Sequence, residues 1–209
     1  MSDDTLYPDD QYLSGMGFIR ILHAVPDAPG VDVYVNDTII LDDISFGEWT
    51  DYFMAPEGTY RLTIYATGTK DSPVASNMLT LMEDDMVTVA AVGTLNNVEL
   101  LAIPDANSPM ISDKAMIRFL HLSPNAPAVD ITLPDGTVIF SNDSFREITP
   151  YIAVNPMNYT LQVRLAGTTR VVLTAPDIVL EAGEFYTIYA IGLAGGTPEI
   201  EALLLIDGI

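Results

Sequence analysis

The sequence predicts an all-β protein made of two tandem immunoglobulin-like antiparallel β-sandwich domains. Three observations lead to this prediction. The chain repeats itself at an offset of 98 or 99 residues, apolar residues alternate with polar ones along short segments, and turn-forming residues separate those segments. No segment shows the apolar period of an amphipathic helix.

The repeat is the strongest of these observations. Residues 19–33 read IRILHAVPDAPGVDV, and residues 117–131 read IRFLHLSPNAPAVDI. Residues 79–93 match residues 178–192 at an offset one residue longer, because the second copy gains a residue near Pro134-Asp-Gly. Since the matches extend across each copy, the chain divides into two domains of ordinary size.

The limits of the repeat predict the domain boundaries. The first β-sandwich repeat covers residues 17–104, the second covers residues 115–209, and the proline-rich polar stretch 105–114 is expected to be a linker. Residues 1–16 belong to neither repeat. They form an N-terminal extension, either a tail or a donor arm that adds a strand to a neighbouring sheet. The first ten residues lack the basic and apolar regions of a secretory signal.

Within each copy the pattern is that of strands. Residues 31–35 (VDVYV), 60–65 (YRLTIY) and 161–165 (LQVRL) alternate or are rich in β-branched and aromatic residues. Turn residues such as those at 134–136 (PDG) separate the segments, which gives about seven strands per copy.

The composition excludes several classes of function. Asp and Glu number 29 against 8 Lys and Arg, so the net charge of −21 would repel nucleic acid. No apolar stretch is long enough for a membrane-spanning helix. The chain has no cysteine, which excludes disulfides, thiolate metal sites and cysteine nucleophiles. The acidity is compatible with cation binding, with a salty surface environment or simply with solubility, of which solubility is favoured, and the scarcity of lysine favours an extracellular or high-salt setting.

Two equivalent sets of polar residues are the best candidates for a site. One set is Arg20, His23 and Asp32, and the other is Arg118, His121 and Asp130. A histidine beside a carboxylate suits a general base or a metal ligand, but each set has too few ligands for a transition metal. Because the sets occur in both copies, we expect a structural polar cluster that satisfies loop carbonyls. No catalytic or metal-binding residue is predicted.

The acidic turns and the aromatic residues offer weaker sites. Turns such as Glu83-Asp-Asp carry the carboxylates that Ca²⁺ prefers, but none has the spacing of an EF-hand loop, so solvated turns are favoured, Ca²⁺ is a weak alternative and no other cofactor is predicted. Trp49 and Tyr52 suit a sugar-stacking platform. Tyr52 recurs as Tyr151, which favours packing in the core or on the sheet surface instead, and the replacement of Trp49 by Ile148 favours a core position. The common enzyme motifs are missing.

The repeat also resembles a known family. The run at 20–34 (RILHAVPDAPGVDVY), Phe46-Gly47, residues 56–60 (PEGTY) and residues 180–186 (LEAGEFY) are similar to DUF4397, a bacterial and archaeal domain of unknown function often found in tandem on surface proteins. The resemblance implies a β-sandwich and a surface location. It implies no activity and no catalytic residues.

We therefore expect a non-enzymatic structural or interaction protein, located outside the cell or on a cell or spore surface. The partners expected are further copies of the chain, assembling into a filament or coat, or other surface proteins. The alternative is an adhesive or carbohydrate-binding module with a site on its loops.

Overall fold

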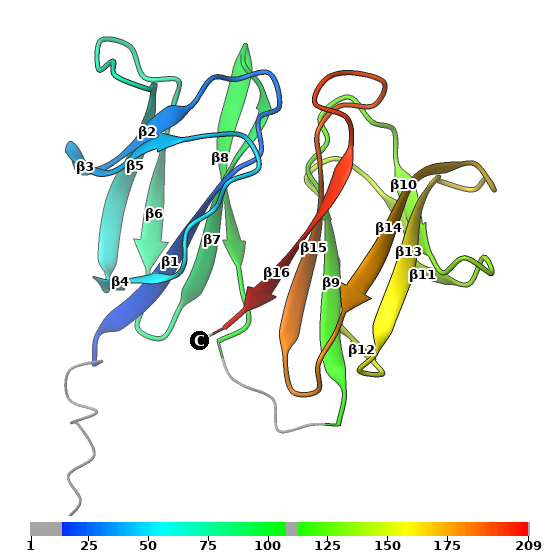
Figure 1. The fold of residues 1–209 in the computed structure, drawn as a ribbon. Helices are drawn as coiled ribbons and strands as arrows, with labels where there is room; N and C mark the ends of the chain where they lie inside the picture. Colours follow the sequence, from blue (N-terminus) through cyan, green and yellow to red (C-terminus); the bar gives the residue numbers. More distant parts are fainter. Residues whose placement is uncertain (1–13, 108–112, 209) are drawn as a thin grey trace, which may run out of the picture.

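A computed structural model describes residues 14–107 and 113–208. Strands are labelled as in Figure 1, and no helix occurs in these two ranges. Most of the predicted N-terminal extension and the middle of the predicted linker, residues 1–13 and 108–112, lie outside the described residues.

Each copy of the repeat forms eight strands, one more than the sequence pattern indicates. The first copy contains β1 (Met16–His23), β2 (Val31–Val35), β3 (Thr38–Ile44), β4 (Phe53–Pro56), β5 (Gly58–Ala66), β6 (Ala75–Leu81), β7 (Met86–Thr94) and β8 (Asn97–Pro104). The second contains β9 (Ala115–His121), β10 (Val129–Thr132), β11 (Val138–Asp143), β12 (Ile152–Val154), β13 (Asn158–Leu165), β14 (Val171–Val179), β15 (Phe185–Ile191) and β16 (Glu201–Asp207). The short strands β4 and β12 have too few residues to show an alternating pattern.

Each copy is a sandwich of two four-stranded sheets, which confirms the predicted all-β class with two tandem sandwich domains. In the first copy the sheets have the orders β4-β1-β7-β8 and β3-β2-β5-β6. The second copy repeats them as β12-β9-β15-β16 and β11-β10-β13-β14. The strands pair antiparallel, except that β1 pairs parallel with β7 and β9 with β15.

The two sandwiches pack against each other, so that the four sheets form four layers (Figure 1). The sheets that contain β1 and β9 are the two inner layers. A shared apolar cluster between them draws on both copies, with Leu22 and Val92 from the first and Leu120 and Tyr189 from the second.

This arrangement explains why the inner strands are apolar along their whole length. A strand in an outer layer has one face in water and alternates, whereas a strand in an inner layer is covered on both faces. Along β7, Val87, Val89 and Ala91 face the core of their own sandwich, while Ala90 and Val92 face the other sandwich. Eight of the nine residues of β7 are therefore buried.

Candidate functional site

Eight polar side chains meet where the two sandwiches pack, and we call them the interdomain cluster. Four come from each sandwich and occupy equivalent positions in the repeat. The cluster consists of Arg20, Tyr52, Thr88 and Asp105 and of their counterparts Arg118, Tyr151, Thr187 and Asp207.

Arg20, on β1, reaches from the first sandwich to the second. Its Nη2 donates to Asp207 Oδ1 over 2.6 Å, and its Nη1 donates to the carbonyl of Ile206 over 2.7 Å. Its Nε donates to Thr88 Oγ1 over 2.9 Å, and the guanidinium lies 4.5 Å from the ring centroid of Tyr52. Hydrogen bonds and ring stacking thus hold the guanidinium on both sides of the interface.

Arg118, on β9, makes the same contacts in the opposite direction. Its Nη2 donates to Asp105 Oδ1 over 2.5 Å, and its Nη1 donates to the carbonyl of Pro104 over 2.7 Å. Its Nε donates to Thr187 Oγ1 over 2.8 Å, and the guanidinium lies 4.5 Å from the ring centroid of Tyr151. The cluster therefore has approximate twofold symmetry that relates the two copies.

Each aspartate is held by its own sandwich and paired with the arginine of the other. Asp105 Oδ2 accepts from the Tyr52 hydroxyl over 2.7 Å and from the Thr88 hydroxyl over 2.5 Å. Asp207 accepts in the same way from the tyrosine and threonine of the second sandwich. Burial, together with the nearby charge of Asp207, raises the pKa of Asp105.

The charged side chains of the cluster are almost fully buried, whereas Tyr52 and Tyr151 are half-buried. The side chains of Arg20 and Arg118 are 4% exposed, and those of Asp105 and Asp207 are 0% exposed. The hydroxyl of Tyr189 is also buried and has no hydrogen-bond partner. Such a cluster is able to hold two domains in a fixed orientation, and Arg20 and Tyr52 also line an open cleft of about 460 Å³ at the edge of the interface.

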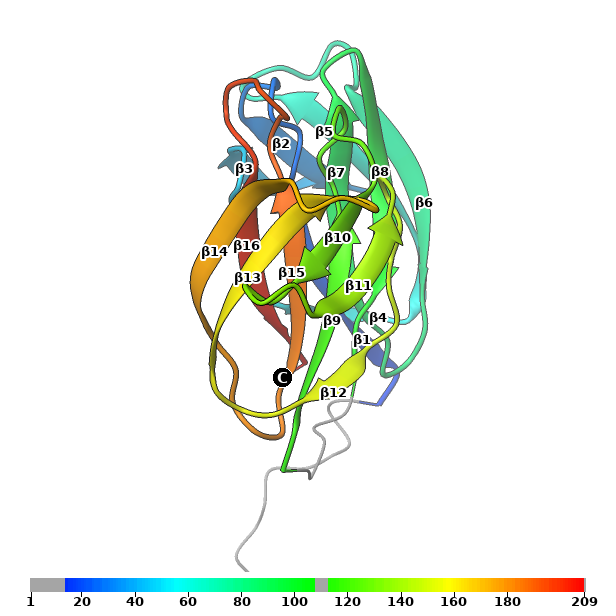
Figure 2. The same ribbon diagram turned by 90° about the vertical axis from the view of Figure 1, so that its right-hand side faces the viewer.

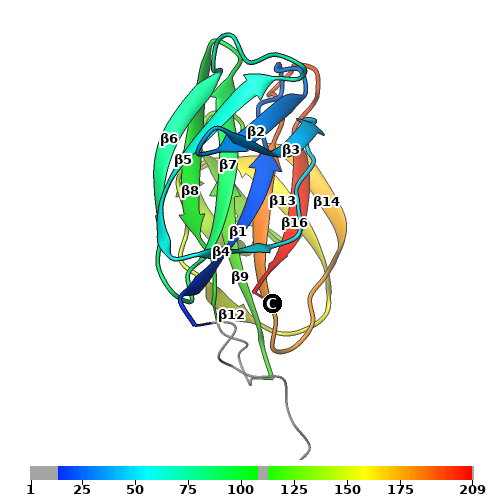
Figure 3. The same ribbon diagram turned by 90° about the vertical axis from the view of Figure 1, so that its left-hand side faces the viewer.

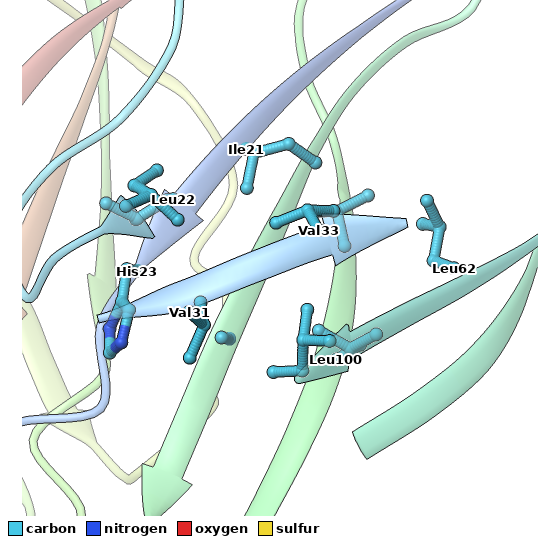
Figure 4. Close-up of a pocket in the computed structure, with 11 residues that line it drawn as sticks. Ile21, Leu22, His23, Val31, Val33, Leu62 and Leu100 are labelled. Atoms are coloured by element: carbon cyan, nitrogen blue, oxygen red, sulfur yellow. The ribbon is translucent and has the colours of Figure 1, made fainter. Parts of the chain in front are cut away.

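The two histidines lie inside the sandwiches. His23 lines a cavity of about 10 Å³ within the first sandwich (Figure 4), roughly the space of one water molecule. Its Nε2 lies 3.3 Å from the carbonyl of Pro29, and its Nδ1 accepts from the backbone N–H of Val25. His121 is equally buried, with Nε2 3.1 Å from the carbonyl of Pro127. Burial lowers the pKa of both histidines, which favours the neutral rings.

The aspartates of the two predicted sets stabilise turns. Asp32 accepts hydrogen bonds from the backbone N–H groups of Asp43 and Gly68 over 3.0 and 2.9 Å. Asp130 accepts from the N–H groups of Asn142 and Gly167 over 2.8 and 2.9 Å. Both carboxylates therefore fix a loop of their own sandwich against the adjacent strand.

The structure does not bring the three residues of either set together. Arg20 lies in the interface between the sandwiches, His23 inside its sandwich, and Asp32 on the outer sheet. The sequence pattern did not indicate the carboxylates that pair with Arg20 and Arg118. One of them, Asp105, lies at the start of the predicted linker. The recurrence of Tyr52 as Tyr151 was the one sequence feature that pointed to this cluster.

Trp49 corrects another expectation. The replacement by Ile148 in the second copy favoured a core position, but Trp49 is 46% exposed and Ile148 is 37% exposed. Each forms only an isolated bridge to an inner strand, Trp49 to Leu22 and Ile148 to Leu120, and so stays at the rim of the inner sheet.

An open cleft, one of several in the described residues, lies at the loop end of the second sandwich. It has a volume of about 670 Å³ and lies between the start of β14 and the β15–β16 loop. Arg170 and Glu199 contribute charged groups, and Val172 and Leu193 contribute apolar walls. Its lining contains no aromatic residue.

The described part of the chain offers no metal centre. Across residues 14–107 and 113–208, no three His, Asp or Glu side chains gather closely enough to hold a metal ion. The same residues contain no helix that would cross a bilayer.

Comparisons with known proteins give a family. Residues 17–132, more than half of the chain, match the model of DUF4397, a domain of unknown function. No curated protein matches the chain.

Solved structures give only distant likenesses. The C-terminal domain of AlgF from P. aeruginosa is 19% identical, with 45% of this chain and 98% of that one covered and a TM-score of 0.34. A carbohydrate-binding module of family CBM26 from Eubacterium rectale Amy13K is 9% identical, covers 90% and 96%, and has a TM-score of 0.29. An α-glucan-binding streptococcal virulence factor is 11% identical, covers 85% and 92%, and has a TM-score of 0.27. At these scores the likenesses say nothing about a ligand of this chain.

Proposed function

This chain belongs to the DUF4397 family, and we propose that it is a non-enzymatic structural and interaction protein of a bacterial cell or spore surface. The observation that carries the proposal is the interdomain cluster. Its two arginines and two aspartates are buried between the sandwiches and paired with one another. They join two small domains into one block of fixed shape.

A block of fixed shape suits a protein that assembles or spaces other components. Relative motion of tandem domains is expected unless their interface is large and apolar. Here a shared apolar cluster lies beside the buried ion pairs, on the same inner strands. Contacts within the chain therefore set the orientation of one outer sheet relative to the other. Assembly surfaces on the two sandwiches then keep a constant geometry.

The surface location is proposed from the composition and from the family resemblance. An excess of acidic residues, with 29 Asp and Glu against 8 Lys and Arg, keeps a protein soluble where salt screens its own repulsion. The partners that we propose are further copies of the chain, assembling into a filament or coat, or other surface proteins.

Light scattering of the purified protein, over a series of concentrations and salt levels, tests the proposal. We expect the mass to rise above the 22.7 kDa of one chain, and negative-stain electron microscopy to show assemblies of regular shape. A mass of 22.7 kDa under every condition would contradict self-association.

The cleft in the second sandwich favours a second candidate function, an adhesive or carbohydrate-binding module. Its volume falls in the range of small-molecule sites. Arg170 and Glu199 provide donors and acceptors for sugar hydroxyls, and a sugar would be held by hydrogen bonds rather than by stacking because no aromatic residue lines the cleft.

A glycan array followed by titration calorimetry tests this candidate. A glycan that binds the wild type should lose at least about tenfold in affinity with Arg170→Ala, because truncation removes a charged hydrogen-bond donor worth about 1.5–3 kcal/mol. Arg61→Ala, an exposed arginine on the first sandwich, is the matched control. No binding to any glycan, or equal losses in both variants, would exclude a sugar site in this cleft.

A further inference from the structure

Strand β6 lies at the free edge of an outer sheet. It pairs with β5 on one side only, and Figures 2 and 3 show it at the outer margin of the molecule. Such an edge presents unpaired backbone groups to solvent, and proteins ordinarily protect edges by charge, proline, bulges or shortness.

Seven of the eight edge strands in the described residues carry such protection. β4 and β12 have four and three residues. β3, β11 and β14 contain a shift of register against their neighbours, and β8 and β16 carry Glu99 and Glu201. β6 has seven residues (ASNMLTL), no charge, no proline and an unbroken register with β5.

The second copy of the repeat shows what β6 lacks. Leu79 on β6 pairs with Tyr60 on β5, and Ile178 on β14 pairs with the equivalent Tyr159 on β13. Leu79 and Ile178 therefore occupy equivalent positions. Just before them, β14 carries Pro176 and Asp177, where the register shifts and the φ angle of Asp177 is +58°. The first copy has the single residue Met78 there. The same edge is thus blocked in one sandwich and open in the other.

We propose that β6 pairs antiparallel with β6 of a second copy of this chain, with the twofold axis at Met78. The proposal rests on the proposed function of self-association and names the surface that carries it. In this register Met78 of one molecule lies opposite Met78 of the other, and Ser76 of each strand lies opposite Thr80 of the other strand. Two four-stranded outer sheets would become one sheet of eight strands.

The side chains around Met78 match this symmetric partner. On the exposed face, hydroxyls already form ladders with β5, with Thr80 3.3 Å from Thr59 and Ser76 3.0 Å from Thr63. Pairing of β6 with its copy would continue these ladders across the axis, and hydroxyl pairs stabilise antiparallel strands. Met78 is 59% exposed and would be covered by its symmetry mate.

The backbone at the axis is available for such a pair. The N–H of Met78 donates to the side-chain oxygen of Asn77 over 2.8 Å, a bond within the strand that a carbonyl of the second β6 is able to replace. β6 itself carries no charge, so the pairing brings no like charges directly opposite each other.

The charge of the whole chain predicts the salt dependence of this dimer. Two molecules of net charge −21 repel each other, and salt screens that repulsion. Association through β6 should therefore strengthen as the ionic strength rises. Association through complementary charged patches would weaken instead.

Sedimentation velocity over a range of concentrations tests the proposal with two variants of equal charge. Met78→Lys places two lysines opposite each other at the axis and should weaken the dimer by about tenfold or more. Met54→Lys changes a methionine of similar exposure, 58%, on the short edge strand β4 and should leave the dimer unchanged. Hydrogen exchange at rising concentration should add protection in β6.

The outcomes separate this proposal from the proposed function. Wild-type protein that stays monomeric in all conditions contradicts both the pairing through β6 and the proposed self-association. Self-association that Met78→Lys leaves intact, or that Met54→Lys weakens equally, overturns the pairing through β6 and leaves self-association standing. An open polymer that disappears when residues 1–13 are deleted would assign the edge to a donor strand and also overturn the symmetric pair.

Discussion

Asp207→Asn is expected to lower stability far more than the same substitution at an exposed ion pair. Asp207 accepts from Arg20 across the interface over 2.6 Å, and both side chains are almost fully buried. Asparagine keeps the shape but removes the negative charge, so the guanidinium of Arg20 keeps its own charge without its partner. Its nearest remaining carboxylate, Asp105, lies 3.7 Å away and already pairs with Arg118.

The size of the effect follows from the burial. Breaking a buried ion pair by removing one partner costs about 3–5 kcal/mol, because the remaining charge stays desolvated. For a chain of this length, about 2–4 °C of melting temperature accompanies each kcal/mol. Asp207→Asn should therefore lower the melting temperature by about 6–20 °C.

Asp37→Asn is the matched control. Asp37 also pairs with an arginine over 2.6 Å, but the side chains of Arg61 and Asp37 are 51% and 67% exposed. Exposed pairs contribute about 0.2–1 kcal/mol. The φ angle of Asp37 is +69°, which asparagine tolerates as well as aspartate, so the control carries no added backbone strain.

Urea denaturation and calorimetry of the two variants measure the difference. The double variant Arg20→Met with Asp207→Asn should cost less than the sum of its single variants, with a coupling energy of about 1–3 kcal/mol. Equal losses for Asp207→Asn and Asp37→Asn, or additive losses in the double variant, would refute the assignment of the interdomain cluster as the element that joins the sandwiches.

Two further predictions concern single positions. Asp143 has a buried Oδ2 without a partner, and burial, with Glu147 and Asp130 nearby, raises its pKa from 3.8 to about 6. The native state thus binds the proton more tightly, and stability falls as the pH rises from 3.8 to about 6. The equivalent residue of the first copy is Ile44. Asp143→Ile should therefore raise the free energy of unfolding at pH 8 by about 1–3 kcal/mol, with a smaller gain below pH 4. Urea denaturation at the two pH values measures this, and no gain at pH 8 would contradict the prediction. Gly192 has φ +93°, and an added Cβ would lie 2.1 Å from the carbonyl oxygen of Glu199. Gly192→Ala should cost about 2–4 kcal/mol and Gly195→Ala, with no atom within 4 Å, about 1 kcal/mol; equal thermal shifts would contradict this.

The sandwich fold was predictable because its signals are local. Alternation with period two identifies strands, and the repeat divides the chain without reference to any distant contact. Parity along β1 also separates Arg20 from His23, since residues three apart on a strand point to opposite faces. Arg20 and His23 are therefore close in sequence but cannot belong to one site.

The packing of the two sandwiches was not predictable from such patterns. The hydrogen bond from Arg20 to Asp207 joins residues 187 positions apart, and no periodicity encodes that pairing. The one local sign of this packing is the unbroken apolar run of β7, since a strand with one face in water shows alternating polar and apolar residues. Asp105, in a polar and proline-rich stretch, has the composition of a linker although its carboxylate is buried.

Although the cluster is nearly symmetric, the apolar part of the same interface has diverged between the copies. Tyr189 is the largest fully buried side chain, and Ala90 stands at the equivalent place in the first sandwich. Leu122 and Ala24 form a second large and small pair. Two first sandwiches would meet with alanine on both sides and leave a void, and two second sandwiches would bring two buried tyrosines together.

The interface should therefore select one copy of each kind, even without the covalent connection. Residues 14–107 and 113–208 produced as separate chains should form a 1:1 complex, and each homodimer should be weaker by at least about tenfold. A tenfold loss of affinity corresponds to about 1.4 kcal/mol, and a cavity the size of a lost side chain costs more than that. Sedimentation of each fragment alone and of their mixture measures this. Homodimers as stable as the mixed complex would show that the symmetric ion pairs alone determine which faces meet, since those pairs are the part of the interface that both copies share.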